Sequence, residues 1–464
     1  MSITRRSFVG SALALGAGLA SAAESNVIFK PEDFGAVGDG RTDDSVAMTR
    51  LAKVVNQAGG GSVIFRRTTY VIGGQGKPMP GKYMFPPQEL LKFSGCSRPL
   101  RLMGNGARLL SAAGQRFGVF GSDARPIKHD LPYYGDGMAT PYVAMIQVDS
   151  CSGPVHIADF ELAGEINSLI VGGPYGDTGW QLGGTGLFLQ NNRGSELIER
   201  IYTHHHPLDG IMIDGLDADL TGTSRIVRNL KSQANGRQGC SIVGGRDYLF
   251  SDCSFSDTGR GKLSSAPGAG VDIEAEGGKE IRRLRFTGCR FANNAGAGML
   301  AETGTVEDVR FEDCTFIGTT AWSAWPNKPR LRFDRCTFVG SVVRAYGHVD
   351  ITLATQFTRC TFDDNPALSP QKKVFGGGQP GRPLIDLDNA ENVLFDHCAF
   401  SARHGAALPW SIRAIYKDCT MTQGSQRTGY PRGQYFGSNR ITGNVDLYNT
   451  KISGRLVVNG VLRR

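Results

Sequence analysis

A short phrase recurs in the second half of the chain and constrains its fold more than any other feature. Each copy reads apolar, any residue, aromatic or apolar, two polar residues, Cys, small or polar, and then Phe or Met. The cysteines of successive copies lie 36, 25, 22, 24, 38 and 21 residues apart. A repeat of this length with alternating apolar positions indicates stacked strands in a β-solenoid. The copies are Tyr248–Phe255, Leu284–Phe291, Val309–Phe316, Leu331–Phe338, Thr355–Phe362, Val393–Phe400 and Ala414–Met421.

The same register continues upstream, where Phe160, Ile201 and Leu230 take the place of the cysteine. Ten coils are therefore predicted, and the longest gaps between copies are expected to hold loops. The 63 glycines suit a chain that turns several times in each coil. We expect residues 23–464 to form one elongated β-helical domain.

The N-terminus has the form of an export signal. Arg5 and Arg6 precede an apolar stretch and a run of small residues, which is typical of a twin-arginine signal peptide cleaved after Ala22 or Ala23. The apolar stretch is too short to span a bilayer, and no later segment is long enough. The sequence thus predicts a periplasmic or secreted protein without membrane insertion.

The charge of the chain favours an anionic partner. The formal net charge is +8, and residues 1–22 contain two arginines and no acid, so the exported chain carries +6. Outside the cytoplasm, polysaccharides are the main anionic polymers. The basic residues are scattered and no nucleic-acid recognition motif is present, so binding to nucleic acid is not expected.

The ten cysteines admit two interpretations. In an exported protein they suggest disulfides. Seven of them, however, hold the same inward position of the repeat, where a small apolar side chain stacks on its equivalent in the next coil. A reduced ladder is the favoured interpretation, while Cys96 and Cys151 lie outside it and are free to pair. No cysteine or histidine spacing matches a metal site.

The segment Phe29–Ile72 carries the motifs DFGAVGDG and TDD, then a helical pattern, GGG, and a strand that ends in TY. It resembles the entry module of the pectate-lyase-like superfamily. This resemblance implies an all-β, right-handed parallel β-helix with an N-terminal capping helix. Members of the superfamily include glycoside hydrolases, polysaccharide lyases, uronate epimerases and phage tail depolymerases, so the resemblance implies a fold rather than a single activity.

Residue patterns support the capping helix independently. Thr42 or Asp43 is the expected N-cap, and the glycine run 59–61 reads as a turn into a strand because no Lys-Ser/Thr follows it. The helix would cover the open edge of the solenoid. Its apolar face is expected to contain Val46, Ala47, Leu51, Val54 and Val55.

Two stretches interrupt the rhythm of the coils: a loop-rich insertion at residues 73–145 and a second one at 165–184. Long loops on a rigid scaffold often carry function, and aromatic rings suit the faces of sugars. The alternative is that these loops simply cover apolar surface. Their notable residues are Tyr133, Tyr134, Tyr142, Pro174, Tyr175 and Trp180.

A second repeated strand precedes most of the Cys phrases. Its third and fifth residues are apolar and expected to face inward, so the fourth and sixth face outward. The copies begin at Thr185, Asp209, Gln238, Ala269, Ala297, Ser341 and Pro383. The outward pairs are then Phe188 and Gln190, Met212 and Asp214, Ser241 and Val243, Asp272 and Glu274, Leu300 and Glu302, Arg344 and Tyr346, and Asp386 and Asp388.

Acidic residues gather in the middle of this outward face. Glu274 and Glu302 are expected one strand spacing apart, about 4.8 Å, and Asp214 two spacings from Glu274. Repulsion between like charges raises at least one pKa and creates a proton donor. A pair of carboxyl groups is what glycosidases require. The predicted catalytic residues are Asp272, Glu274, Asp214 and Glu302; Asp386 and Asp388 are interpreted as solubilising.

A histidine run, 204–206, precedes the strand that carries Asp214, and it supports an alternative chemistry. Lyases and uronate epimerases of similar fold use a base beside a cation that stabilises an enediolate. The epimerase strand that Asp209–Gly215 resembles carries Asp and His at its outward positions, where this chain has Met212 and Asp214. His206 could substitute as the base, and Ca²⁺ held by outward acids could assist that route.

The leading hypothesis is an exported glycoside hydrolase that acts on an acidic exopolysaccharide without a cofactor. The alternatives are a lyase or uronate C5-epimerase, and a non-catalytic glycan-binding or envelope protein. Trimers are common among β-helical depolymerases, so a homotrimer is a further possibility. The predicted substrate-binding residues are Gln190, Arg237, Arg246, Lys262, Arg344, Tyr346 and Trp180.

Overall fold

The computed structural model describes most of the chain after the predicted signal. The described residues are 27–75, 85, 88–126, 138–139, 142–172, 183–220, 222–376, 382–387 and 390–463. The predicted signal peptide and six residues named above lie outside this set: Tyr133, Tyr134, Pro174, Tyr175, Trp180 and Asp388.

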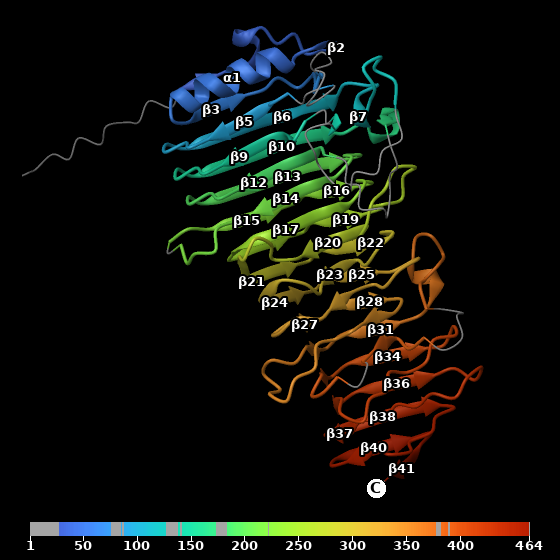
Figure 1. The fold of residues 1–464 in the computed structure, drawn as a ribbon. Helices are drawn as coiled ribbons and strands as arrows, with labels where there is room; N and C mark the ends of the chain where they lie inside the picture. Colours follow the sequence, from blue (N-terminus) through green and yellow to red (C-terminus); the bar gives the residue numbers. More distant parts are fainter. Residues whose placement is uncertain are drawn as a thin grey trace, which may run out of the picture.

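Parallel pairing between strands of successive coils builds the whole stack (Figure 1). Each coil places a strand beside the equivalent strand of the coil before it, as the repeat predicts. The register follows the sequence alignment, since Phe160 pairs with Ile201, and Lys231 with both Tyr202 and Ser254. The molecule is therefore a parallel β-helix, and its coils continue upstream and downstream of the predicted ten.

Three columns of strands make up the coils. The first column carries the aromatic half of the repeat: β3 Gly61–Ile64, β6 Leu100–Ser111, β10 Val155–Ala163, β13 Glu196–His204, β15 Arg225–Arg228, β18 Tyr248–Ser251, β21 Glu280–Thr287, β24 Thr305–Glu312, β27 Arg332–Asp334, β30 Gln356–Thr358, β33 Leu394–Asp396, β35 Ile415–Lys417, β37 Gln434–Phe436 and β39 Lys451–Ile452.

The second column follows the cysteine positions, and β6, β10 and β13 run through both columns. Its other members are β2 Asp39–Asp43, β4 Thr69–Ile72, β16 Lys231–Gln233, β19 Ser254–Ser256, β22 Arg290–Ala292, β25 Thr315–Ile317, β28 Thr337–Val339, β31 Thr361–Asp363, β34 Ala399–Ala402, β36 Thr420–Gln423, β38 Ser438–Gly443 and β40 Arg455–Val458.

The third column, here named the site sheet, contains the second repeated strand. Its members are β5 Leu91–Ser94, β9 Ala144–Asp149, β12 Thr185–Gln190, β14 Asp209–Asp214, β17 Gln238–Arg246, β20 Ala269–Ile273, β23 Met299–Ala301 and β26 Trp325–Pro326, and the two-stranded sheet of β29 Val342–Val343 and β32 Ile385–Asp386 continues it. The predicted insertion at 73–145 thus contributes β5, β6 and β9 to the coils.

The remaining elements lie at the ends and the loops. They are β1 Ile28–Phe29, β7 Arg116–Val119, β8 Met138–Ala139, β11 Ile170–Gly172, β41 Val461–Arg463, and the 3₁₀ helices η1 Pro31–Phe34, η2 Ile166–Ser168 and η3 Pro366–Leu368. Strand β41 pairs antiparallel with β40 at the C-terminal end of the stack (Figure 1). Among the described residues, no helix combines the length and apolar character needed to cross a membrane.

The N-terminal end is covered by helix α1, Ser45–Gln57, as predicted (Figure 1). Two details of the prediction are wrong. The N-cap residue is Asp44, one residue past the predicted positions. Val46 and Val54 are exposed; the residues that face the core are Ser45, Ala47, Met48, Leu51, Ala52 and Val55. The buried Ser45 hydroxyl is satisfied, because it donates a hydrogen bond to the Asp43 carboxylate and accepts one from the Gly73 amide.

The polar residue just before each repeat cysteine turns the coil. It adopts the left-handed conformation in every copy, with φ between 52° and 63°, so a single residue bends one strand column into the next. Asp, His and Gly are favoured in this conformation, whereas Arg adopts it at some cost. The residues are Asp252, Gly288, Asp313, Arg335, Arg359, His397 and Asp418.

Inside the coils, the repeat positions form continuous ladders. The terminal phenylalanines of successive copies stack nearly parallel, with centroids 4.7 to 5.5 Å apart from Phe255 to Phe400. Each repeat cysteine is buried, and its Sγ lies 3.3 to 3.7 Å from a carbonyl oxygen of the preceding coil. The cysteines therefore form the inward ladder that the sequence predicts.

All ten cysteines are free and buried, including Cys96 and Cys151, which contact each other.

We therefore expect a thiol reagent to label the native mature protein at no more than a trace level. Unfolding in denaturant without reductant is expected to expose ten reactive thiols. Quantitative thiol titration checks this. A result of eight thiols after unfolding would contradict this expectation, because it would mean that two cysteines form a disulfide. Cys96 and Cys151 are the candidates, since they contact each other.

Candidate active site

The outward register of the site sheet agrees with the sequence in its central coils. Met212 pairs with Ser241, Ser241 with Asp272, Asp272 with Leu300, and Leu300 with Trp325. These residues form one column along the axis of the helix. Glu274 and Glu302 come just after the paired residues of β20 and β23, so their predicted one-spacing relation and the two-spacing relation between Asp214 and Glu274 stay predictions.

The predicted register of the outward column differs from the structure at two places. In β17 the register shifts so that Asp214 pairs with Gly244 instead of Val243. In β29, Val342 pairs with Ile385 and Val343 with Asp386, so Val343 lies in the outward column instead of facing inward. A left-handed residue, Arg344 with φ of 50°, then restores the alternation. Bulges of this kind leave no clear signal in an apolar pattern.

Asp272 lies at the centre of this face in an enclosed position. Its side chain is only 3% exposed, and one carboxyl oxygen accepts a hydrogen bond from Gln238 Nε2 at 2.6 Å. Burial, and next the neighbouring carboxylate of Glu274, raise the pKa of Asp272 to about 8, although Arg237 acts in the opposite direction. Asp272 is therefore protonated at neutral pH, as a general acid must be.

Gln238 forms the inner wall beside Asp272. It is 3% exposed, and its Oε1 has no hydrogen-bond partner among the described residues. A buried amide oxygen without a donor is costly, so this atom is suited to accept a hydrogen bond from a hydroxyl group that enters the site.

Glu274 and Glu276 follow Asp272 on the solvent side. Glu274 is half-buried and accepts a hydrogen bond from the Thr303 hydroxyl. Partial burial, and next the charge of Glu274, raise the pKa of Glu276. The alternation of β20 thus places one enclosed, protonated acid and one more accessible carboxylate on the same side of one strand.

Asp214 belongs to a hydrogen-bonded chain two spacings away. Lys279 forms an ion pair with Asp214, and Gln190 Nε2 donates to the same carboxylate at 3.1 Å. Gln147 Nε2 lies 3.4 Å from Gln190 Oε1 and extends the chain to β9. The structure therefore brings the predicted Asp214 and Gln190 together and adds Lys279.

On the other side, Glu302 contacts Arg344 with an N–O distance of 2.7 Å. The Arg344 guanidinium also lies over the ring of Trp325, 5.3 Å from its centroid. Trp325 stands in the outward column next to Leu300. An aromatic ring at this position is suited to pack against the face of a sugar.

The basic residues predicted to bind substrate differ in their surroundings. Arg237 is bound by the buried Asp209 through both carboxylate oxygens. Arg246 lies at the far end of β17, where the strand joins the first column, and pairs with Asp217, Asp219 and Glu280. Lys262 is exposed in the segment before β20. Of these three, only Arg237 contributes charge to the surroundings of Asp272.

His206 lies inside the coil, away from the outward face. It is fully buried; its Nε2 contacts the Leu162 carbonyl oxygen at 3.1 Å, and its Nδ1 lies 3.4 Å from the Tyr142 hydroxyl. Burial lowers the pKa of His206 to about 3. The side chain is neutral and enclosed, so we do not include it in the proposed site.

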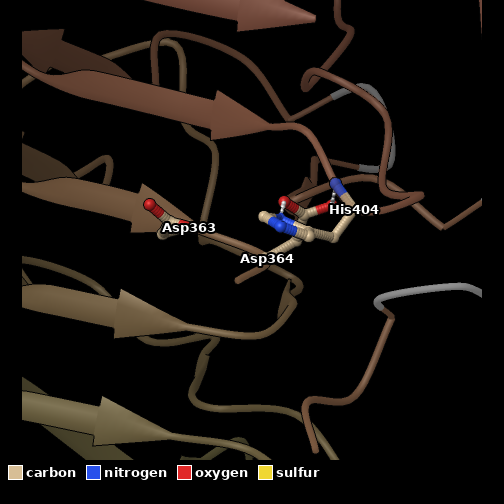
Figure 2. A group of neighbouring side chains, drawn as sticks. All are labelled: Asp363, Asp364 and His404. Atoms are coloured by element: carbon tan, nitrogen blue, oxygen red, sulfur yellow. Dashed lines mark hydrogen bonds and ion pairs between the residues drawn. The ribbon is translucent and has the colours of Figure 1, made fainter. Parts of the chain in front are cut away.

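A group of possible metal ligands lies elsewhere, at the end of β31, just after it, and in the loop after β34 (Figure 2). The oxygen and nitrogen atoms of Asp363, Asp364 and His404 lie within 4.8 Å of one another. Asp364 is nonetheless occupied, because its carboxylate accepts hydrogen bonds from three backbone amides, those of Arg403, His404 and Ala406. This carboxylate fixes a turn, and the group needs no ion to explain it.

The outward acids of the site sheet form no such group within the described part of the chain. They follow one another along the face instead of surrounding one point. Ca²⁺ assistance and the absence of a cofactor both stay predictions.

The comparisons with known proteins agree with the architecture. A family model described as a right handed beta helix region matches residues 177–338, which contain β14, β17, β20 and β23. This chain is a right-handed parallel β-helix. The fold that the resemblance of the entry segment implied is thereby confirmed. No curated protein matches the chain in sequence.

Solved β-helix structures are similar over most of the chain. They include the A-module of the mannuronan C-5 epimerase AlgE4 of Azotobacter vinelandii (14% identity, TM-score 0.46, 91% of this chain and 99% of that one). An exopolygalacturonase of Thermotoga maritima is 12% identical with a TM-score of 0.37, over 94% and 93%. Tailspike gp49 of Acinetobacter baumannii phage Fri1, a capsular polysaccharide depolymerase, is 14% identical with a TM-score of 0.44, over 91% and 64%.

Sequence reasoning missed several residues of this face. Gln238 begins its strand copy, at a position not read as outward, and Glu276 and Lys279 follow the strand in a turn. Trp325 lies in a coil whose strand copy lacks the Gly pattern. The spacing of the neighbouring repeats could have located Trp325, because it lies 25 residues after Leu300, about one coil.

Proposed function

We propose that this β-helix is an exported glycoside hydrolase that cleaves a polysaccharide bound along the site sheet. The observation that carries the proposal is the pair formed by Asp272, buried with a pKa of about 8, and Glu274, two residues further on the same outward face. Export rests on the N-terminal sequence alone.

In this proposal Asp272 is the general acid. Its proton is retained at neutral pH because burial disfavours the carboxylate, and transfer of that proton to the glycosidic oxygen assists departure of the leaving sugar. Gln238 holds the carboxyl group in place through its amide hydrogen bond.

Glu274 is the second carboxyl group. Residues i and i+2 of a strand point to the same face, with Cα atoms roughly 6.6 Å apart. We propose the inverting mechanism, in which the two carboxyl groups stand about 6.5–9.5 Å apart and leave room for a water molecule. Glu274 then activates a water molecule on the opposite face of the sugar. Thr303 orients the Glu274 carboxylate through its hydroxyl.

A lyase or epimerase is the alternative, with a different signature. It would need a base near neutral pKa beside Asp272, and the predicted candidate, His206, is enclosed in the coil. The third possibility is a non-catalytic glycan-binding protein, and glycan binding alone does not require a carboxyl group with a raised pKa such as that of Asp272.

The test is incubation of the mature protein with neutral and uronate-containing polysaccharides, including the exopolymer of the producing organism. Reducing ends and ultraviolet absorbance of unsaturated products are followed together. We expect new reducing ends without absorbance. Absorbance that rises with reducing ends would establish elimination and overturn hydrolysis, and retention of polymer without shortening would favour binding alone.

A further inference from the structure

A separate pocket opens on the C-terminal side of the acidic face. It has a volume of about 590 Å³, within the range of ligand sites. Its walls come from the segments after β26, β29 and β32 and from the segment between β34 and β35. Among the lining residues are Arg344, Tyr346, His348, Leu387, Glu391 and Arg413.

Two guanidinium groups face this pocket. Arg344 and Arg413 are each about half exposed, with 51% and 57% of their side chains accessible. Each contacts one carboxylate, Glu302 at 2.7 Å and Glu391 at 3.5 Å. Because a guanidinium carries five N–H donors, one such contact leaves donors for a further anion.

The pocket also offers flat and apolar surface. The rings of Tyr346 and His348 lie nearly parallel, with centroids 6.2 Å apart. Val349 and Leu387 line the pocket beside them, and Val349 is 74% exposed. A sugar that bears a carboxylate combines the C–H face and the charge for which these walls are suited.

The pocket is continuous with the acidic face. Arg344 contacts both Glu302 and Trp325, which stand on the next two strands toward Asp272. Strand pairing places Asp272, Leu300, Trp325 and Val343 in succession, so the pocket begins three strand spacings from Asp272, or about 14 Å. A polymer lying along the axis would reach both places.

We propose that this pocket is a subsite for a uronate residue of the substrate, with the sugar carboxylate between Arg344 and Arg413. The proposal rests on the hydrolase function proposed above, and it identifies the substrate as a polymer with carboxylated sugars. The pocket then fixes how the chain of sugars is positioned relative to Asp272.

Binding of monosaccharides to the full mature protein tests the subsite without any reaction. Ligand-observed NMR titration with glucuronate, galacturonate and mannuronate is compared with glucose, galactose and mannose. We expect at least one uronate to bind with a Kd in the millimolar range and its neutral counterpart to bind at least 10-fold more weakly. Acetate is added as a competitor, because equal displacement by acetate would reveal a simple anion site and overturn the proposal.

Single substitutions test whether uronate binding occurs in this pocket. Arg413→Gln is expected to weaken uronate binding about 10-fold, since a charge-assisted contact is lost, and to leave neutral sugars unaffected. The matched control is Arg440→Gln, an exposed arginine on β38 outside the pocket, for which no change is expected. The subsite would be overturned if both variants lost uronate affinity equally. It would also be overturned if wild-type protein bound no uronate at a ligand concentration 50-fold above the expected Kd.

The outcome is independent of the proposed catalysis. If Asp272→Asn abolishes cleavage but uronates do not bind, the hydrolase stands and the subsite fails. If uronates bind in an Arg413-dependent way while no polymer is cleaved, the pocket stands and the hydrolase proposal fails.

Discussion

Replacing Asp272 with Asn is expected to lower the rate of polysaccharide cleavage by a factor of about 10³, the middle of the range for loss of a general acid. Asn has the same shape and can still accept the Gln238 hydrogen bond, but it has no proton to transfer. The measurement is kcat by reducing-end assay on the polymer identified in the panel, with circular dichroism to confirm that the variant is folded.

A control separates the role of Asp272 from a general loss of negative charge. Asp149→Asn changes an outward acid on β9 of the same sheet, and it is expected to alter kcat by less than about twofold. An Asp272→Asn variant that keeps more than a tenth of wild-type activity would contradict the assignment of the general acid.

The same residue predicts two pH effects. Activity that depends on protonated Asp272 should fall as pH rises above about 8.

The raised pKa of Asp272 also affects stability. In the folded protein the Asp272 carboxyl group keeps a proton that the unfolded chain releases near pH 3.8. This residue therefore makes the free energy of unfolding decrease between about pH 4 and 8 and then level off. Asp272→Asn should flatten that decrease in chemical unfolding measured across this range.

Glu196→Ala is expected to have the largest effect on stability, a loss of about 3–5 kcal/mol. Glu196 and Arg225 are 1% and 2% exposed, with an N–O distance of 3.6 Å. The Glu196 carboxylate also accepts hydrogen bonds from Tyr248 Oη at 2.6 Å and Asn192 Nδ2 at 2.8 Å. Burial raises the pKa of Glu196, while Tyr248, Asn192 and Arg225 lower it. Removing the carboxyl group leaves the Arg225 guanidinium, the Tyr248 hydroxyl and the Asn192 amide buried without this partner. Urea-induced unfolding measures the loss.

Two comparisons make this result specific. Lys417→Ala breaks an exposed pair with Asp396 and is expected to cost no more than about 1 kcal/mol. Replacing the whole network with apolar residues, by combining Glu196→Leu, Arg225→Met and Tyr248→Phe, should recover most of the lost stability. A loss below about 1 kcal/mol in Glu196→Ala would show that the hydrogen bonds from Arg225 to the carbonyl oxygens of Arg246 and Asn192 satisfy the guanidinium on their own.

The fold could be predicted from the sequence to a large extent, because the repeat is local. Period-two alternation and a cysteine recur in every copy, and six of the seven copies end in phenylalanine. Stacking of equivalent residues in successive coils follows directly from their alignment. The outward placement of Asp272 and Glu274 came from the same alternation. The register shift between Asp214 and β17 and the outward placement of Val343 could not be predicted. Ile242 and Val243 are both apolar, as are Val342 and Val343, so the alternation does not decide which of the two faces outward.

What the sequence by itself determined is the β-helical stack, the capping helix and the column of outward acids, because these depend on period and spacing within single coils. The tertiary structure alone decided how each of these acids is surrounded. Enclosure raises the pKa of Asp272, Lys279 pairs with Asp214, and His206 is turned into the coil. Burial and pairing arise from contacts between coils that are tens of residues apart, and such contacts set the electrostatics of a site.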